Sequence, residues 1–117
     1  MTRKLLVTSA LPYANGPLHF GHLLEHIQTD IWVRSQRILG NHCIYLCASD
    51  AHGTPIMMKA EEENIAPEKL VDKYMKAHKK TLEAFQVSHD CYYQTHSEEN
   101  KKYSELIYNT ALKNGYI

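Results

Sequence analysis

Two short segments of this 117-residue sequence gather the residue types that could do chemistry. The first, PYANGPLHFGH over residues 12–22, combines turn-forming residues with His19 and His22. The second, SDAHGTP over residues 49–55, carries Asp50. Imidazoles can donate hydrogen bonds to a phosphate, and a carboxylate can accept them from an ammonium group or a ribose hydroxyl, although Asp50 could also simply cap a turn. We therefore examine the two segments as candidate parts of one binding site.

The first segment fits a phosphate site at the start of a helix. A helix N-terminus presents unpaired backbone N–H groups and the positive end of the helix dipole. His19 and His22, three residues apart on the first turn, can both face an anion there. Gly21 lets a flat ligand such as a nucleobase approach the backbone, while Asn15 and Gly16 supply a tight turn. The expected ligand is a nucleotide phosphate, although neither a Walker loop nor a G-x-G-x-x-G fingerprint occurs in the sequence.

Two other interpretations of these histidines stay open from the residues alone. His19, His22 and His26 have the spacing H-x-x-H-x-x-x-H, and three imidazoles could hold zinc with an open fourth position. A zinc site has no need of the glycine-rich loop, however, and Glu25 lies outside an H-E-x-x-H frame. Purely structural histidines are the third interpretation. Four other histidines belong to no recognisable cluster and are expected on the surface or in packing roles: His42, His78, His89 and His96.

The surrounding pattern predicts a βαβ unit that places both segments at one edge of a parallel sheet. Residues 4–11 form a short, mostly apolar run that indicates a buried strand, and residues 42–49 form a second. Between them, apolar residues at helical spacing from His19 to Ile38 predict a helix, with Gly40 as its stop signal. Ligands of open α/β sheets bind outside the carboxyl ends of the strands, which is where both segments lie.

The rest of the sequence continues the same alternation. Thr54 and Pro55 indicate the N-cap and first residue of a short helix, and Pro67 opens another. Residues 90–96 could form a third strand, and Ser97 caps a last helix. We predict an α/β fold with a Rossmann-like, doubly wound parallel sheet and flanking helices.

The composition is that of an ordinary globular protein, with 44% hydrophobic and 22% charged residues. Thirteen basic and 13 acidic residues leave no formal net charge, so we expect no polybasic nucleic-acid surface. No apolar run reaches the ~18 residues that cross a bilayer, so no membrane association is expected. Cys43, Cys47 and Cys91 indicate reduced thiols in a cytoplasmic protein, with Cys43 and Cys47 on the core face of a strand.

The segments ALPYANGPLHFGH and CASDAHGTPI resemble the class I aminoacyl-tRNA synthetases, specifically the bacterial-type methionyl-tRNA synthetases. HFGH stands where that class has His-Ile-Gly-His, and DAHGTP is similar to the methionine enzymes. LEHIQTDIWVRSQR and THSEEN extend the resemblance along essentially the whole chain. The resemblance implies a methionine–tRNA ligase, which uses ATP and Mg²⁺ to activate L-methionine as methionyl-adenylate. The methionyl group then passes to tRNA(Met), for translation initiation and elongation.

The resemblance also implies roles for individual residues. His19 and His22 are the expected catalytic pair, which stabilises charge that develops on the phosphates. The expected ATP-binding residues are Pro12, Asn15, Gly16, His19, Gly21 and His22. The expected methionine-binding residues are Leu11, Tyr13 and Asp50. No metal ligand is expected in this chain, and zinc only in an inserted domain of the family.

Compared with that family, residues 1–117 are expected to be the N-terminal half of the nucleotide-binding catalytic domain. The Lys-Met-Ser-Lys-Ser loop of the second half does not occur in the sequence, and we expect the inserted and anticodon-binding domains to be absent as well. Alone, the chain is expected to bind ATP and methionine weakly and not to charge tRNA. The alternatives are a truncated nucleotide-binding module without catalysis and, less favoured, a small histidine-ligated zinc protein.

Overall fold

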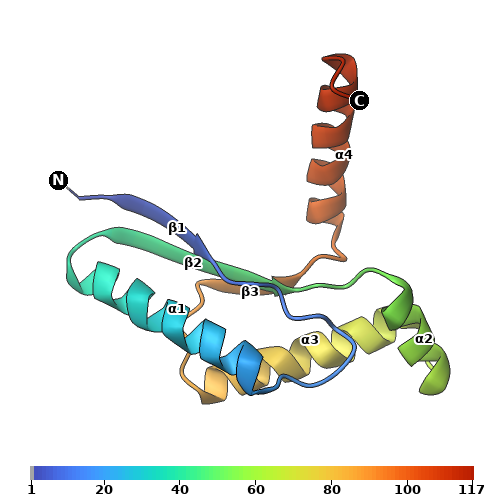
Figure 1. Ribbon diagram of the computed structural model, residues 1–117, viewed down its shortest axis with the longest axis horizontal. Coiled ribbons are helices and arrows are strands. Elements are labelled where there is room, and N and C mark those ends of the chain that lie inside the picture. The colour runs from blue at the N-terminus through green and yellow to red at the C-terminus, as the bar shows by residue number, and fades with distance from the viewer. Residues whose placement is uncertain (1) are drawn as a thin grey trace.

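Three parallel strands form the centre of the structure, a computed structural model that describes residues 2–117. The strands lie side by side in the order β1 (Lys4–Thr8), β2 (His42–Ser49) and β3 (Cys91–Gln94). The helices of the described residues are α1 (Phe20–Ile38), α2 (Thr54–Glu62), α3 (Pro67–Ala84) and α4 (Glu98–Lys113). Figure 1 shows this succession along the chain. The predicted α/β class with a parallel sheet is confirmed.

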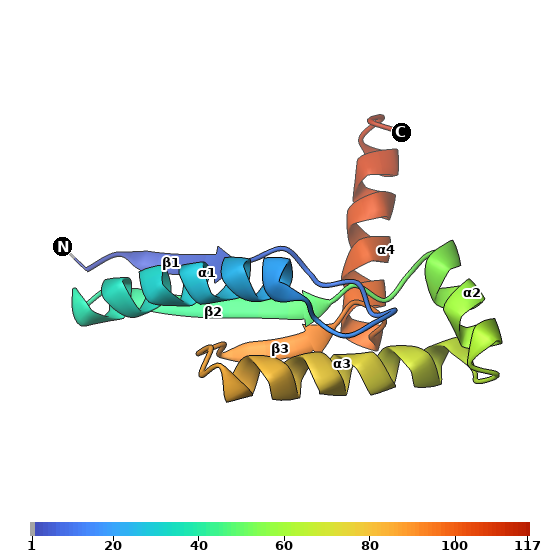
Figure 2. The same cartoon turned by 60° about the horizontal axis from the view of Figure 1, so that its bottom comes forward.

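The sequential strand order puts α1 and α3 on the same face of the sheet (Figures 1 and 2). Two successive right-handed crossovers between neighbouring strands leave their helices on one side. Alternate residues of β2, namely Cys43, Tyr45 and Cys47, are buried beneath these helices, which confirms the core positions predicted for both cysteines. Helices on the second face, which a doubly wound sheet has, do not occur among residues 2–117.

Several predicted boundaries differ from those observed. β1 covers residues 4–8 rather than 4–11, and β3 covers 91–94 rather than 90–96. The chain leaves the sheet at Ser9, whose hydroxyl contacts Tyr45 Oη at 2.9 Å in the core. Gly53, and not Thr54, is the N-cap of α2, and it makes no side-chain cap hydrogen bond. Ser97 caps α4 as predicted, because its side chain accepts a hydrogen bond from the Asn100 N–H.

A second apolar cluster lies where α2 and α3 pack against the loops that follow β1 and β2. Its buried members are Ala14, Ala51, Ile56, Ala60, Leu70 and Val71. Ala14 and Ala51 come from the two segments singled out in the sequence, so this cluster fixes their backbones. By contrast, α4 has no buried residue and projects away from the sheet (Figures 1 and 2). Within residues 2–117, no helix is both long and apolar enough to span a bilayer.

Candidate functional site

The two segments meet at the carboxyl ends of β1 and β2, as predicted. Tyr13 and Asp50 form a parallel bridge beyond the ends of both strands. The Asp50 N–H donates to the Pro12 carbonyl at 2.8 Å, and the Ala14 N–H donates to the Asp50 carbonyl at 2.8 Å. These bonds use only the backbone of Asp50, so its carboxylate is not needed to hold the loop. Pro12 is fully buried and joins the two segments through its carbonyl.

His19 and His22 cap the N-terminus of α1 and lie against each other. His19 is the N-cap residue, and its Nδ1 accepts a hydrogen bond from the Gly21 N–H at 3.1 Å. The Nδ1 of His22 accepts one from the His19 N–H at 3.2 Å. The two rings stack with their centroids 3.7 Å apart. This reciprocal pattern is a capping box in which two imidazoles replace the usual hydroxyl and carboxylate.

The capping bonds determine which nitrogen of each imidazole carries the proton. A ring nitrogen that accepts a hydrogen bond must be unprotonated, so in the neutral ring the proton lies on Nε2. Partial burial, followed by the nearby His19, lowers the pKa of His22, which favours this neutral form at pH 7. Each imidazole therefore offers one Nε2–H donor to a ligand. Such a pair suits hydrogen bonds to the oxygens of a phosphate.

Two glycines keep the site open at its tightest points. A Cβ on Gly21 would lie 3.0 Å from Cε1 and 3.1 Å from Nδ1 of His19, so a side chain there would press on the N-cap imidazole. Gly53 has a φ of +126°, and a Cβ there would lie 2.6 Å from the Tyr13 hydroxyl. That hydroxyl donates to the His52 carbonyl at 2.9 Å and so ties the first segment to the second.

The structure does not bring His26 together with His19 and His22, so it gives the hypothesis of a zinc site from these three residues no support. His26 is 1% exposed, and its Nδ1 faces Ser9 Oγ at 3.2 Å and His89 Nε2 at 3.4 Å. Its side chain points into the core, whereas His19 lies exposed at the start of α1. The first turn of α1 therefore carries two of these histidines and the buried face of the helix carries the third.

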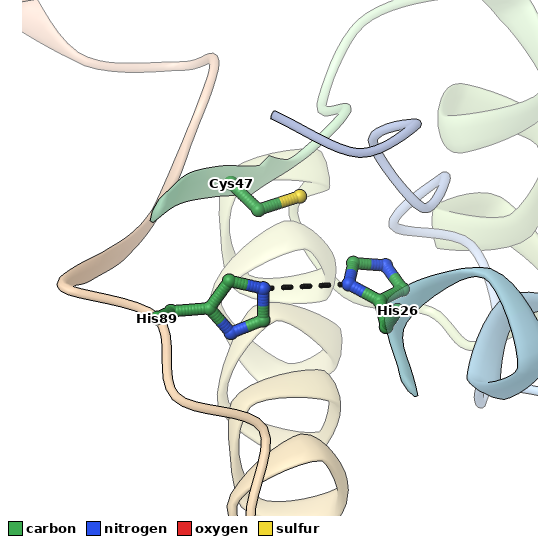
Figure 3. A group of neighbouring side chains, drawn as sticks. All are labelled: His26, Cys47 and His89. Carbon is green, nitrogen blue, oxygen red and sulfur yellow. Dashed lines mark hydrogen bonds between the residues drawn. The ribbon is translucent and has the colours of Figure 1, made fainter. Parts of the chain in front are cut away.

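Among the described residues, the group whose atoms could hold a metal ion is His26, Cys47 and His89 (Figure 3). Its three candidate ligand atoms lie within 4.8 Å of one another. Burial, followed by His26, lowers the pKa of His89 to about 4, and burial raises the pKa of the Cys47 thiol. Neutral imidazoles and a thiol can make the hydrogen bonds observed here with Ser9 and with each other. We interpret the group as a polar part of the core.

Sequence reasoning missed three contacts made by other histidines. His89, expected on the surface or in packing, is half-buried and packs against His26 in the group just described, a partner that the sequence did not indicate. His78 is also buried, and its Nε2 lies 2.7 Å from the Gly16 carbonyl oxygen. His96 Nδ1 lies 3.2 Å from His52 Nε2 beside a groove of about 640 Å³ at the ends of β2 and β3. These partners are far apart in the sequence, so no local pattern signals them.

The parallel sheet, its flanking helices and the paired segments at its carboxyl edge are those of a Rossmann-type domain, a class of domain that binds ligands at this edge. A family model described as tRNA synthetases class I (M) matches residues 5–117. The chain belongs to this family of class I tRNA synthetases.

Individual relatives agree with this assignment. The chain is 56% identical to the methionine–tRNA ligase of Leptospira biflexa and 54% identical to that of Neisseria gonorrhoeae. Each comparison covers 100% of this chain and 17% of the relative, so the chain spans about one sixth of the length of these curated relatives. Mycobacterium tuberculosis methionyl-tRNA synthetase in complex with methionyl-adenylate is similar in structure, with a TM-score of 0.80 and 25% identity. That match covers 85% of this chain and 19% of the solved chain.

Proposed function

We propose that the gene product carrying this chain is a methionine–tRNA ligase. It activates L-methionine with ATP to form methionyl-adenylate and transfers the methionyl group to tRNA(Met), for initiation and elongation of translation. Residues 1–117 supply the N-terminal half of its catalytic domain in this proposal. The observation that carries it is the similarity of 85% of this chain to a synthetase solved with methionyl-adenylate, at a TM-score of 0.80. The family model, which matches residues 5–117, spans the paired loops at the ends of β1 and β2.

The chemistry proposed for the first step is an in-line phosphoryl substitution. The carboxylate of methionine attacks the α-phosphorus of ATP, a P–O bond forms, and the bond to pyrophosphate breaks. The Nε2–H groups of His19 and His22 would donate to phosphate oxygens as charge develops on them. Because both rings are fixed by their Nδ1 capping bonds, little reorganisation is needed when the charge appears. Mg²⁺ would enter with ATP and neutralise part of the triphosphate charge.

The remaining contacts follow from where the two segments lie. Gly21 would lie under the adenine, while Asn15, Gly16 and the buried Pro12 would shape the loop around ATP. Asp50 would bind the methionine ammonium group, because a carboxylate is a charged acceptor for ammonium hydrogen bonds. Leu11 would contact methionine through backbone groups, and Tyr13 would form part of the thioether pocket. These assignments rest on the family resemblance and on the shared edge of the sheet.

The other functions of the whole enzyme are proposed for parts beyond this chain. The lysine loop of the second half, the tRNA-binding domain and any zinc in an inserted domain belong there by family resemblance. We propose a cytoplasmic location, since that is where tRNA charging for bacterial-type translation takes place.

Pyrophosphate exchange tests the proposal. The full-length gene product should exchange labelled pyrophosphate into ATP when methionine is present, but not with leucine or isoleucine. The purified 117-residue chain should exchange far more slowly, since the resemblance assigns it half of the catalytic apparatus. Exchange driven by another amino acid would refute methionine specificity. If the gene product bound ATP without any exchange, the alternative of a nucleotide-binding module without catalysis would replace this proposal.

A further inference from the structure

His78 joins α3 to the loop of the first segment through a chain of buried hydrogen bonds. Its side chain is 1% exposed. Its Nε2 lies 2.7 Å from the Gly16 carbonyl oxygen, and its Nδ1 lies 2.9 Å from Ser49 Oγ. Ser49 Oγ lies in turn 2.9 Å from the Tyr92 hydroxyl. These hydrogen bonds thus link β3, the end of β2, α3 and the loop between β1 and α1.

The direction of every bond in this chain follows from the Gly16 carbonyl. A carbonyl oxygen can only accept, so Nε2 of His78 must carry a proton. Burial lowers the pKa of His78, so the ring is neutral at pH 7 and Nδ1 must accept. Ser49 therefore donates its hydroxyl proton to Nδ1, and its oxygen accepts from Tyr92. Burial raises the pKa of Tyr92 to about 12, which keeps this last donor protonated.

The Gly16 carbonyl lies in a loop that regular secondary structure does not hold in place. Residues 9–19 contain no helix and no regular strand, and the loop spans from the end of β1 to the N-cap of α1. Near its start the loop is fixed by the bonds between Pro12, Asp50 and Ala14. The His78 bond fixes residues 15–18 to a helix 62 positions further along the chain. Both ring nitrogens of the neutral His78 have a hydrogen-bond partner, so the buried imidazole connects α3 rigidly to the loop.

We propose that His78 is a positioning residue: by holding the Gly16 carbonyl, it fixes the loop of residues 12–18 in the conformation that binds ATP. His78 contacts no substrate in this role. It acts on the loop that carries Asn15 and Gly16 and that leads directly into His19. The inference rests on the proposed function, because it assigns ATP to this loop.

Two substitutions of His78 separate positioning from packing. The side-chain nitrogen of glutamine can reach the position of Nε2, so His78→Gln keeps a donor for Gly16 but lacks the acceptor near Ser49. Asparagine reaches only the position of Nδ1, so His78→Asn keeps a partner for Ser49 and loses the bond to Gly16. In pyrophosphate exchange by the full-length gene product, His78→Asn should raise the KM for ATP roughly three- to tenfold, as expected for one lost hydrogen bond. His78→Gln should raise it by less than about twofold.

A second measurement does not depend on catalysis. Backbone amides of residues 14–18 should exchange with deuterium faster in His78→Asn than in His78→Gln, while amides of β2 behave alike in both. Equal loop exchange and equal KM for ATP in the two variants would overturn the inference. If the gene product shows no pyrophosphate exchange at all, the proposed function fails, and amide exchange still decides whether His78 orders the loop.

Ser49→Ala serves where His78→Asn does not fold. It keeps the imidazole but removes the donor to Nδ1, so the ring loses the hydrogen bond that holds its Nε2–H towards the Gly16 carbonyl. We expect faster amide exchange in residues 14–18 and a rise of roughly two- to threefold in the KM for ATP. A Ser49→Ala protein with the loop exchange and KM of the wild type would overturn the inference.

Discussion

His22 Nδ1 accepts a hydrogen bond from the His19 N–H at 3.2 Å, and the two imidazoles stack with their centroids 3.7 Å apart. The residues expected to bind phosphate therefore also form the cap of α1. One nitrogen of each ring stabilises the helix, and the other remains for a ligand. Substitutions that imitate one nitrogen at a time can separate these two roles.

His22→Asn should preserve the cap of α1 but slow pyrophosphate exchange. The asparagine oxygen can accept from the His19 N–H as Nδ1 does, but no donor remains at the position of Nε2. We expect the free energy of unfolding to change by less than about 0.5 kcal/mol and the rate of pyrophosphate exchange to fall roughly 100- to 1,000-fold. His22→Gln is the matched control, since it keeps a donor near Nε2 but loses the cap, at a cost of about 1 kcal/mol. Equal activity in the two variants would contradict the assignment of Nε2–H as the working donor.

Gly21→Ala should reduce activity without destabilising the helix. The new Cβ would lie 3.0 Å from Cε1 of His19, an exposed side chain that can rotate away. Alanine also favours a helix over glycine by about 1 kcal/mol, which offsets the crowding. Displacing the His19 ring should slow pyrophosphate exchange by on the order of tenfold, because alignment of the donor is lost. Thermal unfolding measured on the same samples should show an unchanged or higher midpoint, and a clearly lower midpoint would contradict this explanation.

Asp50→Asn should weaken methionine binding selectively. The backbone bonds of Asp50 to Pro12 and Ala14 remain, so the fold is expected to keep its stability within about 0.5 kcal/mol. Loss of a charged partner for the ammonium group should raise the KM for methionine on the order of 10- to 100-fold. The KM for ATP, measured in the same exchange assay, should change much less. A larger effect on ATP than on methionine would refute the assigned contact.

Gly53→Ala should lower the free energy of unfolding by more than backbone strain alone accounts for. Gly53 and Gly40 both have positive φ, at +126° and +80°, but only at Gly53 does a Cβ meet another group, the Tyr13 hydroxyl at 2.6 Å. Gly40→Ala is therefore the control for strain, which is about 1–3 kcal/mol at such positions. Urea unfolding should show a greater loss in Gly53→Ala than in Gly40→Ala. The KM for methionine should rise only in Gly53→Ala, because that substitution displaces Tyr13.

Acidification should destabilise the protein between about pH 7 and pH 4. Burial lowers the pKa of His26, His78 and His89 in the folded state, that of His89 to about 4, below the unfolded value of 6.5. As the pH falls from 7, the unfolded chain takes up protons that the folded chain excludes, so the free energy of unfolding decreases. Each such histidine contributes at most about 1.4 kcal/mol per pH unit, and none contributes above pH 7.

Urea unfolding at pH 7.5, 6.0 and 5.0 measures this slope. His89→Phe should make the slope shallower by up to one proton, while His26 and His78 still contribute to it. A stability that stayed constant or increased towards pH 5 would contradict the neutral state of these imidazoles.

Local patterns in the sequence predicted the order of the elements and the location of the two segments. The apolar run of residues 42–49 and the helical spacing from His19 to Ile38 are local signals, and each is confirmed by the element it predicted. The bridge between Tyr13 and Asp50 could be expected from them, since parallel neighbouring strands end at one edge. The family could also be identified from short contiguous motifs. The strand ends were less predictable, because Ser9 leaves the sheet for a contact with Tyr45 in the core.

The contacts of the histidines could not be predicted from the sequence and are seen only in the tertiary structure. His26 faces His89 across 63 positions, and His78 holds Gly16 across 62. Histidines that look alike in the sequence thus have three different roles. His19 and His22 cap α1, His26 packs in the core, and His78 holds the loop at Gly16. A periodic pattern shows which face of a helix a residue occupies, but not which distant segment packs against that face. The partner is set by the packing of whole helices on the sheet, a property of the assembled fold that no short stretch of sequence contains.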